Sequence, residues 1–342
     1  MRANALRSIS MDAMPAETSS DAGRWLWNGF LMPGDLTLLT SQWKTGKTTL
    51  LAGLLQRLGS GEPFLNRPTR LARAWVLSEE SESHWADRLR RMPIGPHAQL
   101  ISRPFRGRPT PEDWSDLIDR AVEESAAGRL DLVVVDPLAS FLPGRCESDA
   151  AMLLEALQPL HRLTAAGMAV LLLHHPRKKN SEVGSSARGS GALLGFVDCS
   201  LELTRYSRLG TDAKRRLILG QSRREGTPAR LAYEWNPSTG AFAVCTDPRE
   251  RQFEENWQTV LGILKDRTGA IALREIAEVW PPDADKPGLS TLYGWLNLAY
   301  DRKLIRREGR GTKGDPWRYR SENEDDQYYG RGELPPLKPL RW

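Results

Sequence analysis

Residues 36–50 combine side chains that could bind a phosphate group. The stretch reads Leu-Thr-Leu-Leu-Thr-Ser-Gln-Trp-Lys-Thr-Gly-Lys-Thr-Thr-Leu, with an apolar run ending at Thr40 and an apolar, helix-favouring segment starting at Leu50. A phosphate-binding P-loop places Gly, four residues and then Gly-Lys-Ser/Thr between a strand and a helix. Ser41 replaces the first Gly, and the rest of the pattern is intact. A chance Gly-Lys-Thr is the alternative, and the flanking strand and helix count against it.

Each part of this loop has a chemical role. The backbone N–H groups of residues 43–48 could surround a β-phosphate, and the N-terminus of the following helix would add partial positive charge. Gly46 permits a close approach of the backbone, Lys47 would reach the β- and γ-phosphates, and the Thr48 hydroxyl would bind magnesium. We therefore predict ATP and Mg²⁺ as ligands. The predicted nucleotide-binding residues are Ser41, Gln42, Trp43, Lys44, Thr45, Gly46, Lys47, Thr48 and Thr49.

Titratable side chains follow three further apolar strands. Glu79 and Glu80 come after the second predicted strand. Asp136 ends the third, and His174 and His175 come after the fourth. In open α/β sheets, ligands bind beyond the carboxyl ends of the strands. We therefore expect these side chains to lie beside the P-loop.

The two kinds of carboxylate suggest two kinds of chemistry. Asp136 could hold magnesium beside Thr48, and a turn or helix-capping role before Pro137 is the alternative. A carboxylate opposite the leaving group could polarise the attacking water. Because adjacent strand residues point to opposite faces, only one of Glu79 and Glu80 can do so.

The histidine pair suggests a sensor. A His at this position could donate a hydrogen bond to the γ-phosphate and report its loss to the loop that follows. Packing is the alternative for either ring. The basic, Gly- and Ser-rich residues 176–192 form the predicted mobile loop.

The order of elements predicts an α/β fold. Strands alternate with helices up to about residue 200, which favours a mostly parallel sheet with helices on both faces. Residues 93–111 hold several prolines and glycines and are predicted to be irregular. Four later strands are predicted to be antiparallel. The predicted strands are 36–40, 74–78, 130–136, 168–173, 200–205, 216–221, 231–235 and 240–244. One predicted helix follows the P-loop and ends near residue 58, and the others span 82–92, 112–127 and 149–166.

Composition places the 342-residue chain among ordinary globular proteins. Its net charge of +5 permits, without requiring, a nucleic-acid partner. The three cysteines are far apart, which supports neither a disulfide framework nor a zinc site and fits a reducing cytoplasm. No apolar run approaches the ~20 residues of a membrane helix. Trp25 and Trp27 are predicted to pack under the sheet edge rather than stack on adenine.

Taken together, these motifs resemble the RecA-like P-loop ATPases, and within the AAA family the branch of the RepA-type replicative helicases. The resemblance is carried by residues 41–49, 77–80, 133–137, 172–176 and 187–190. The P-loop alone is common to many folds. The ordered set, with Glu after the second strand and His-His after the fourth, is more specific.

The resemblance covers residues 24–246 and implies roles for single residues. Glu79 would be the catalytic base, Asp136 the Walker B carboxylate and His175 the γ-phosphate sensor. Residues 176–191, with Arg177, Lys178, Lys179 and Arg188, would face nucleic acid in the central channel of a ring or filament. An arginine from a neighbouring subunit would stabilise the transition state. Arg188 is the first candidate and Arg224 the second, although Ser222-Arg-Arg224 lacks the Lys of the related Lys-x-Arg pair.

The region after Arg251 has a different pattern. Helices predicted at 254–265, 273–280 and 290–303, followed by a hairpin over 304–320, are typical of a winged helix. Residues 302–320 contain eight cations and two carboxylates, a net charge of +6. This favours phosphate contacts, and a protein-binding winged helix is the alternative.

These observations give one domain prediction and two functional hypotheses. The domains are a flexible N-terminus (1–23), a RecA-like ATPase (24–248), a winged helix (251–320) and a disordered tail (321–342). The first hypothesis is a cytoplasmic, ATP-hydrolysing protein that acts on DNA, is helicase-like and self-associates. The second is an ATP-switched DNA-binding regulator with slow hydrolysis. A small-molecule kinase lacks an evident lid and acceptor site.

Overall fold

The structure is a computed structural model in which the chain forms two compact units, Met1–Cys245 and Thr246–Trp342. The predicted N-terminal segment, the 176–191 loop and the tail lie almost entirely outside the described residues. No helix among the described residues is long and apolar enough to cross a membrane. The described residues are 10, 23–144, 149–175, 191–206, 213–267 and 269–321.

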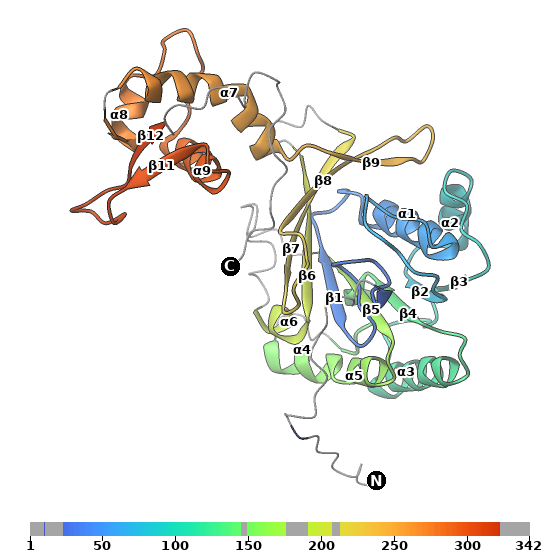
Figure 1. The fold of residues 1–342 in the computed structure, drawn as a ribbon. Coiled ribbons are helices and arrows are strands. Elements are labelled where there is room, and N and C mark those ends of the chain that lie inside the picture. The colour runs from blue at the N-terminus through green and yellow to red at the C-terminus, as the bar shows by residue number, and fades with distance from the viewer. Residues whose placement is uncertain are drawn as a thin grey trace. The chain divides into compact units, whose positions relative to one another are not determined.

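A nine-stranded sheet forms the centre of the first unit (Figure 1). Its strand order is β3-β2-β4-β5-β1-β6-β7-β8-β9. Neighbours from β3 to β6 are parallel, and β6 to β9 continue the sheet antiparallel. The predicted α/β fold with a mostly parallel sheet is therefore confirmed. The strands are β1 (Leu36–Thr40), β2 (Ala74–Ser78), β3 (Ala98–Ser102), β4 (Leu132–Asp136), β5 (Ala169–His174), β6 (Cys199–Arg205), β7 (Arg215–Ser222), β8 (Arg230–Trp235) and β9 (Phe242–Cys245).

Helices cover both faces of this sheet because its central strands are apolar on both faces. All five residues of β1 and of β4 are buried. Successive side chains alternate, so that Leu39 joins one core cluster while Leu36 and Leu38 join the other. Helices α1 (Lys47–Ser60) and α2 (Glu82–Leu89) contribute to the first cluster, and α3 (Pro111–Ala126), α4 (Ala150–Leu157), α5 (Leu160–Ala165) and α6 (Gly191–Phe196) to the second.

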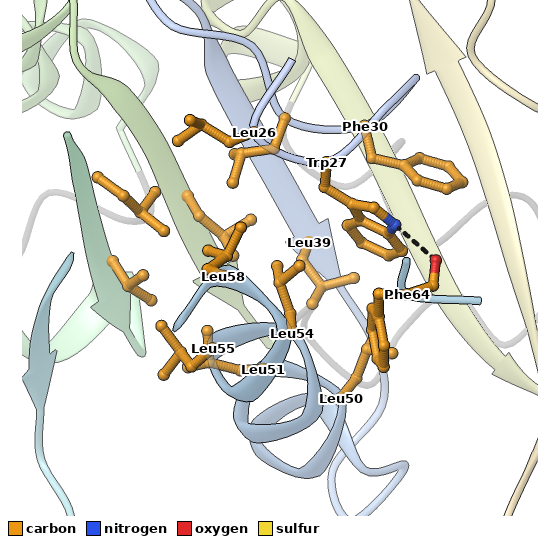
Figure 2. Close-up of a cluster of buried hydrophobic side chains, with 14 of the residues drawn as sticks. Leu26, Trp27, Phe30, Leu39, Leu50, Leu51, Leu54, Leu55, Leu58 and Phe64 are labelled. Atoms are coloured by element: carbon orange, nitrogen blue, oxygen red, sulfur yellow. Dashed lines mark hydrogen bonds between the residues drawn. The ribbon is translucent and has the colours of Figure 1, made fainter. Parts of the chain in front are cut away.

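The first cluster attaches the P-loop helix to the sheet (Figure 2). Leucines of α1 face Leu39 and an aromatic group formed by Trp27, Phe30 and Phe64. The indole Nε1 of Trp27 donates to the Phe64 carbonyl at 3.2 Å. Trp25 and Trp27 are both buried, so these tryptophans pack in the core and do not offer a face to adenine.

The first unit differs from the prediction at two places in particular. Residues 93–111 contain the edge strand β3, which pairs with β2 although its Ala-Gln-Leu-Ile-Ser sequence is only partly buried. The predicted single helix over 149–166 is two helices, α4 and α5, which meet at Pro159 because proline cannot continue the hydrogen-bond ladder of a helix.

Within residues 246–267 and 269–321, the second unit contains three helices and a three-stranded sheet of order β10-β12-β11. Its core includes Phe253, Trp257, Trp295 and Tyr319. The first helix begins six residues before the predicted start, at Pro248 after the N-cap Asp247, and the third begins at Leu289 after Gly288. The elements are α7 (Pro248–Lys265), β10 (Ile271–Ala272), α8 (Leu273–Glu278), α9 (Leu289–Asp301), β11 (Ile305–Glu308) and β12 (Arg318–Ser321), of which β10 was not predicted.

Candidate nucleotide-binding site

The carboxyl ends of β1, β2, β4 and β5 form one edge of the sheet, the carboxyl edge. Register pairs Thr40 with His174 and Ser78 with Asp136, so four chain segments leave the sheet side by side. The P-loop leaves β1 at this edge and enters α1. Gly46 caps that helix with a φ of 106°, which side chains rarely adopt.

Lys47 is held inside the loop. Its Nζ lies 3.0 Å from Ser41 Oγ and 2.9 Å from Nδ1 of His175. Burial lowers the pKa of Lys47 to about 8, and burial followed by the charge of Lys47 lowers the pKa of His175. The unprotonated ring nitrogen of a neutral imidazole can accept a hydrogen bond from a neighbouring ammonium. The P-loop lysine and the predicted sensor histidine therefore contact each other directly.

Thr48 and Asp136 form the second contact. The Thr48 hydroxyl donates to Oδ2 of Asp136 at 3.0 Å. Asp136 is buried, and burial raises its carboxyl pKa from the usual 3.8 to about 6. The short 3₁₀ helix that follows (Leu138–Ser140) has Pro137 at its N-cap and no side-chain cap, so Asp136 does not cap it.

This pair fits magnesium. A buried carboxylate and a hydroxyl are hard oxygen ligands, and a cation beside them would offset the cost of burying the carboxylate. Among the described residues, no group of three or more His, Cys, Asp or Glu side chains could hold a metal ion by itself. Magnesium in such sites takes one or two protein ligands together with phosphate oxygens and water. Bound there, it would neutralise charge on the phosphates.

The two glutamates after β2 differ in their contacts. Glu80 forms an ion pair with Arg88 of α2 at 2.8 Å. The exposed Glu79 accepts a hydrogen bond from the Ser140 hydroxyl, and the Arg103 Nε donates to the Glu79 carbonyl at 2.8 Å. The charge of Glu79 acts on His175 and raises its pKa, against the larger lowering by burial. Glu80 is therefore held toward α2, and the Glu79 side chain is held toward the segment that follows β4.

Comparison with known proteins gives the family. A family model described as an AAA domain matches residues 3–181, more than half of the chain. The chain belongs to the AAA domain family. No curated protein matches the chain. Among solved structures, an ATPase domain is similar at 13% identity, covering 62% of this chain and 85% of that chain, with a TM-score of 0.46. Family membership supports ATP binding and hydrolysis.

Asp136 is expected to lower the stability of this AAA domain. Its pKa is about 6 when folded against 3.8 when exposed, so the folded state binds the proton more tightly and stability falls as pH rises between these values. At pH 7 the difference corresponds to about 3 kcal/mol, an upper limit. We expect Asp136→Asn to unfold at higher denaturant concentration than the wild type at pH 7, with the gain vanishing near pH 4. Asp116→Asn, an exposed carboxylate on α3, is the control; an unchanged or lower stability of Asp136→Asn contradicts the prediction.

Arg216 belongs to the surroundings of the P-loop, and the motifs did not identify it. It lies near the start of β7, opposite Arg205 at the carboxyl end of β6, which brings it to the carboxyl edge. Its Nε donates to the Thr45 carbonyl and its Nη1 to the Ala213 carbonyl, both at 2.7 Å. Burial lowers its pKa. Arg216 lies outside residues 3–181, which the family model matches. The sequence could have indicated its position in one way only: a strand that runs antiparallel to β6 must start at the carboxyl edge.

Loss of the Arg216 guanidinium is expected to loosen the phosphate loop. A hydrogen bond to a charged group contributes about 1.5–3 kcal/mol, so Arg216→Ala should raise the KM for ATP by about 10- to 100-fold. Arg216→Lys should recover part of this loss. Arg215→Gln, whose guanidinium contacts Glu234 on β8, is the matched control. Equal KM values for Arg216→Ala and the control would rule out this role.

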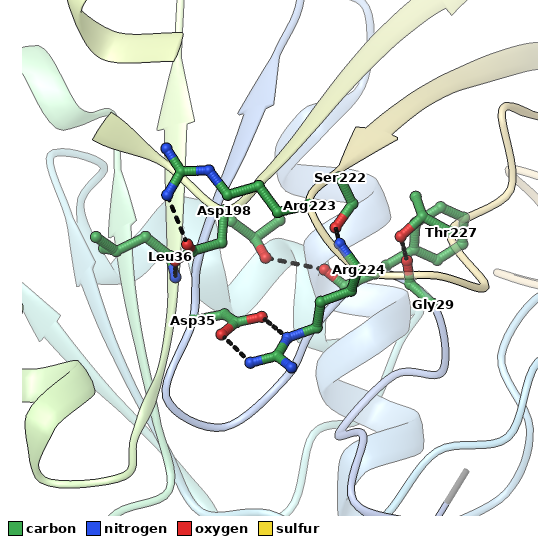
Figure 3. A network of polar contacts seen from close by, with 10 residues as sticks. Gly29, Asp35, Leu36, Asp198, Ser222, Arg223, Arg224 and Thr227 are labelled. Atoms are coloured by element: carbon green, nitrogen blue, oxygen red, sulfur yellow. Dashed lines mark hydrogen bonds and ion pairs between the residues drawn. The ribbon is translucent and has the colours of Figure 1, made fainter. Parts of the chain in front are cut away.

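The structure places Arg224 far from the phosphate loop of its own chain. Arg224 follows β7 and forms a two-pronged ion pair with the buried Asp35, with Nη2 at 2.7 Å from Oδ1 (Figure 3). Asp35 precedes β1, so the pair lies at the amino ends of the parallel strands. Nearby, Asp198 accepts from the Leu36 N–H at 2.9 Å. Arg224 therefore has a structural partner within the chain, and Arg188 lies outside the described residues.

Proposed function

We propose that the chain binds ATP with magnesium at the carboxyl edge and couples its hydrolysis to nucleic acid, in a helicase-like role in DNA replication, recombination or repair. The observation that carries this proposal is the meeting of four strand ends, in which Lys47 contacts His175 and Thr48 contacts Asp136. Ser41–Thr49 would enclose the phosphates. A switch without hydrolysis would not need a carboxylate placed as Glu79 is.

Each side chain would have a distinct role. Lys47 would leave Ser41 and His175 to meet the β- and γ-phosphates, and Thr48 with Asp136 would hold magnesium. Glu79 would accept a proton from the attacking water while Ser140 orients its carboxylate. Lys47 and Thr48 lie in the first turn of α1, Asp136 ends β4 and Glu79 follows β2, so neighbouring elements at one sheet edge bring these side chains together.

His175 would connect the phosphate site to nucleic acid. Its ring contacts Lys47, and in sequence it directly precedes residues 176–191, which carry Arg177, Lys178, Lys179 and Arg188. A γ-phosphate that draws Lys47 away would release the imidazole from that contact. The change at His175 would then pass to the basic residues that follow it, where DNA phosphates would be bound.

We further propose that the second unit is a winged helix and that the chain works as a ring or filament. Three helices followed by the β11–β12 hairpin support the first idea. In an assembly, an arginine of a neighbouring subunit would complete the site, and Arg188 is the first candidate. Arg224 is the weaker one, because it would have to leave Asp35 to act.

ATP hydrolysis measured without nucleic acid, with single-stranded DNA and with duplex DNA tests the proposal. Stimulation by single strands is the expected result. Slow turnover that no nucleic acid changes would contradict it and favour the ATP-switched regulator. That alternative further requires duplex binding to differ between the ATP and ADP states.

A further inference from the structure

An arginine lies between two aromatic rings in the second unit. The Arg307 guanidinium on β11 is 4.0 Å from the ring centre of Tyr300 on α9 and 4.2 Å from that of Trp317. Its Nη1 donates to the side-chain oxygen of Asn297 at 3.3 Å. Stacking and this bond fix the orientation of the guanidinium. Within residues 269–321, no carboxylate forms an ion pair with Arg307, so its charge is not neutralised by this part of the unit.

Four other arginines of residues 302–320 have carboxylate partners, and two of these partners lie outside the stretch whose charge was counted. The net charge of +6 over residues 302–320 already subtracts Glu308 and Asp315, but it leaves out Glu250 and Glu275, which lie elsewhere in the chain. Arg302 is packed against Glu250 with little exposure, and Arg320 pairs with Glu308 at 3.0 Å. Arg310 and Arg318 also have carboxylate partners, Asp315 and Glu275, each at 4.0 Å. Compared with these four arginines, Arg307 is held by rings and an amide rather than by a carboxylate.

Helix α9 is poorly suited to reading duplex DNA by itself. A helix that enters a major groove contacts base edges and phosphates with polar and basic side chains. Leu289–Asp301 contains no Lys or Arg. Its most exposed large side chains are Leu289, Tyr293 and Tyr300, at 45%, 42% and 38% exposure. The positive charge lies on the hairpin, and aromatic surface lies on the helix beside it.

The hairpin backbone is shaped around the same stack. Gly309 and Gly311 have φ values of 97° and 71°. A Cβ at Gly309 would lie 2.7 Å from the Pro316 carbonyl, and a Cβ at Gly311 would collide with the indole of Trp317. The two glycines let the turn close onto Trp317. The stack of Tyr300, Arg307 and Trp317 is therefore already formed before a ligand binds.

We propose that the second unit binds single-stranded nucleic acid on the platform of Tyr300, Arg307 and Trp317, with the hairpin rather than α9 as the main contact. Any of the bases can stack on an aromatic ring, and a guanidinium held in place can bind a phosphate or stack on a base. Lys313 at the hairpin turn adds charge along the backbone of the strand. The inference rests on the proposed nucleic-acid function and assigns it a surface and a strand type.

The test measures binding of a fluorescent single-stranded oligonucleotide and of a duplex of equal length by anisotropy, with the full chain and without nucleotide. Arg307→Gln removes the charge but keeps a donor for Asn297. It is expected to weaken single-strand binding by about 10-fold or more, with a smaller effect of Lys313→Gln. The slope of log affinity against log salt should become shallower by about 0.7 for each phosphate that the variant no longer binds.

Arg274→Gln is the matched control, an exposed arginine on α8 in the same unit with the same change in charge. Equal binding by Arg307→Gln, Lys313→Gln and the control would overturn the proposal, as would tighter binding of the duplex by the wild type. Lys313→Gln keeps the test valid if Arg307→Gln does not fold. ATP hydrolysis by the wild type is measured separately. Single-strand binding that depends on Arg307 in a chain that does not hydrolyse ATP would contradict only the proposed function. ATP hydrolysis in a chain whose binding does not depend on Arg307 would contradict only the present inference.

Discussion

Lys47→Ala is expected to lower ATP hydrolysis by at least about 100-fold, comparable to removing one donor from a preorganised anion site. Lys47 is the cation held inside the phosphate loop, where its ammonium lies 3.0 Å from Ser41 Oγ. Burial already lowers its pKa to about 8, so a phosphate that replaces the missing solvation would favour the charged form. Alanine leaves the loop without a side-chain cation at this position.

Nucleotide binding and turnover should be measured on the same preparations, by titration with a fluorescent ATP analogue and by phosphate release. Lys214→Ala, an exposed lysine just before β7, controls for loss of one positive charge. His175 should also respond: without the neighbouring ammonium, its pKa is expected to rise, which NMR titration can follow. Turnover within a factor of about two or three of wild type would show that Lys47 does not bind the transferred phosphate.

Glu79→Gln is expected to abolish turnover while leaving ATP binding largely intact. A positioned general base contributes about 10²- to 10⁴-fold to a rate. Glutamine keeps the shape of the side chain and can still accept the Ser140 hydrogen bond, but it cannot take a proton from water. The Glu79 carboxylate accepts a hydrogen bond from Ser140, which follows β4 and lies outside the P-loop. Because Glu79 forms this contact outside the loop, the P-loop should keep its affinity for the nucleotide.

Glu80→Gln is the matched control one residue away. It removes the ion pair with Arg88 and is expected to lower stability more than turnover, because Glu80 is held toward α2. Thermal unfolding and phosphate release together separate these effects. If Glu80→Gln stopped hydrolysis while Glu79→Gln remained active, the roles of the two carboxylates would be exchanged.

The architecture of the carboxyl edge could be predicted because its strands are unusually apolar. β1 and β4 are buried along their whole length, and such continuous apolar runs indicate parallel strands whose carboxyl ends share an edge. That placement was enough to expect Asp136 beside Thr48 and His175 beside the P-loop, and both side chains contact it. β3 was missed because it is an edge strand whose sequence alternates too weakly to distinguish it from the surrounding loop.

Contacts between distant positions could not be predicted. Arg216 reaches Thr45 across 171 residues, and Arg224 reaches Asp35 across 189. The residues next to Arg216 and Arg224 in the sequence do not distinguish them from arginines exposed to solvent. Only the fold therefore shows that Arg216 contacts a carbonyl and Arg224 a carboxylate. The charge of the C-terminal hairpin was overestimated for the same reason, because the partner of Arg302, Glu250, lies on α7, outside the stretch that was counted.

The most direct measurement is a single-turnover experiment with γ-labelled ATP and the wild-type chain, in the presence of magnesium or of excess EDTA. A carboxyl edge organised as described should release labelled phosphate with magnesium and lose that activity with EDTA. Bound ATP that stays intact with magnesium, even when single-stranded or duplex DNA is added, would contradict ATP hydrolysis at this site.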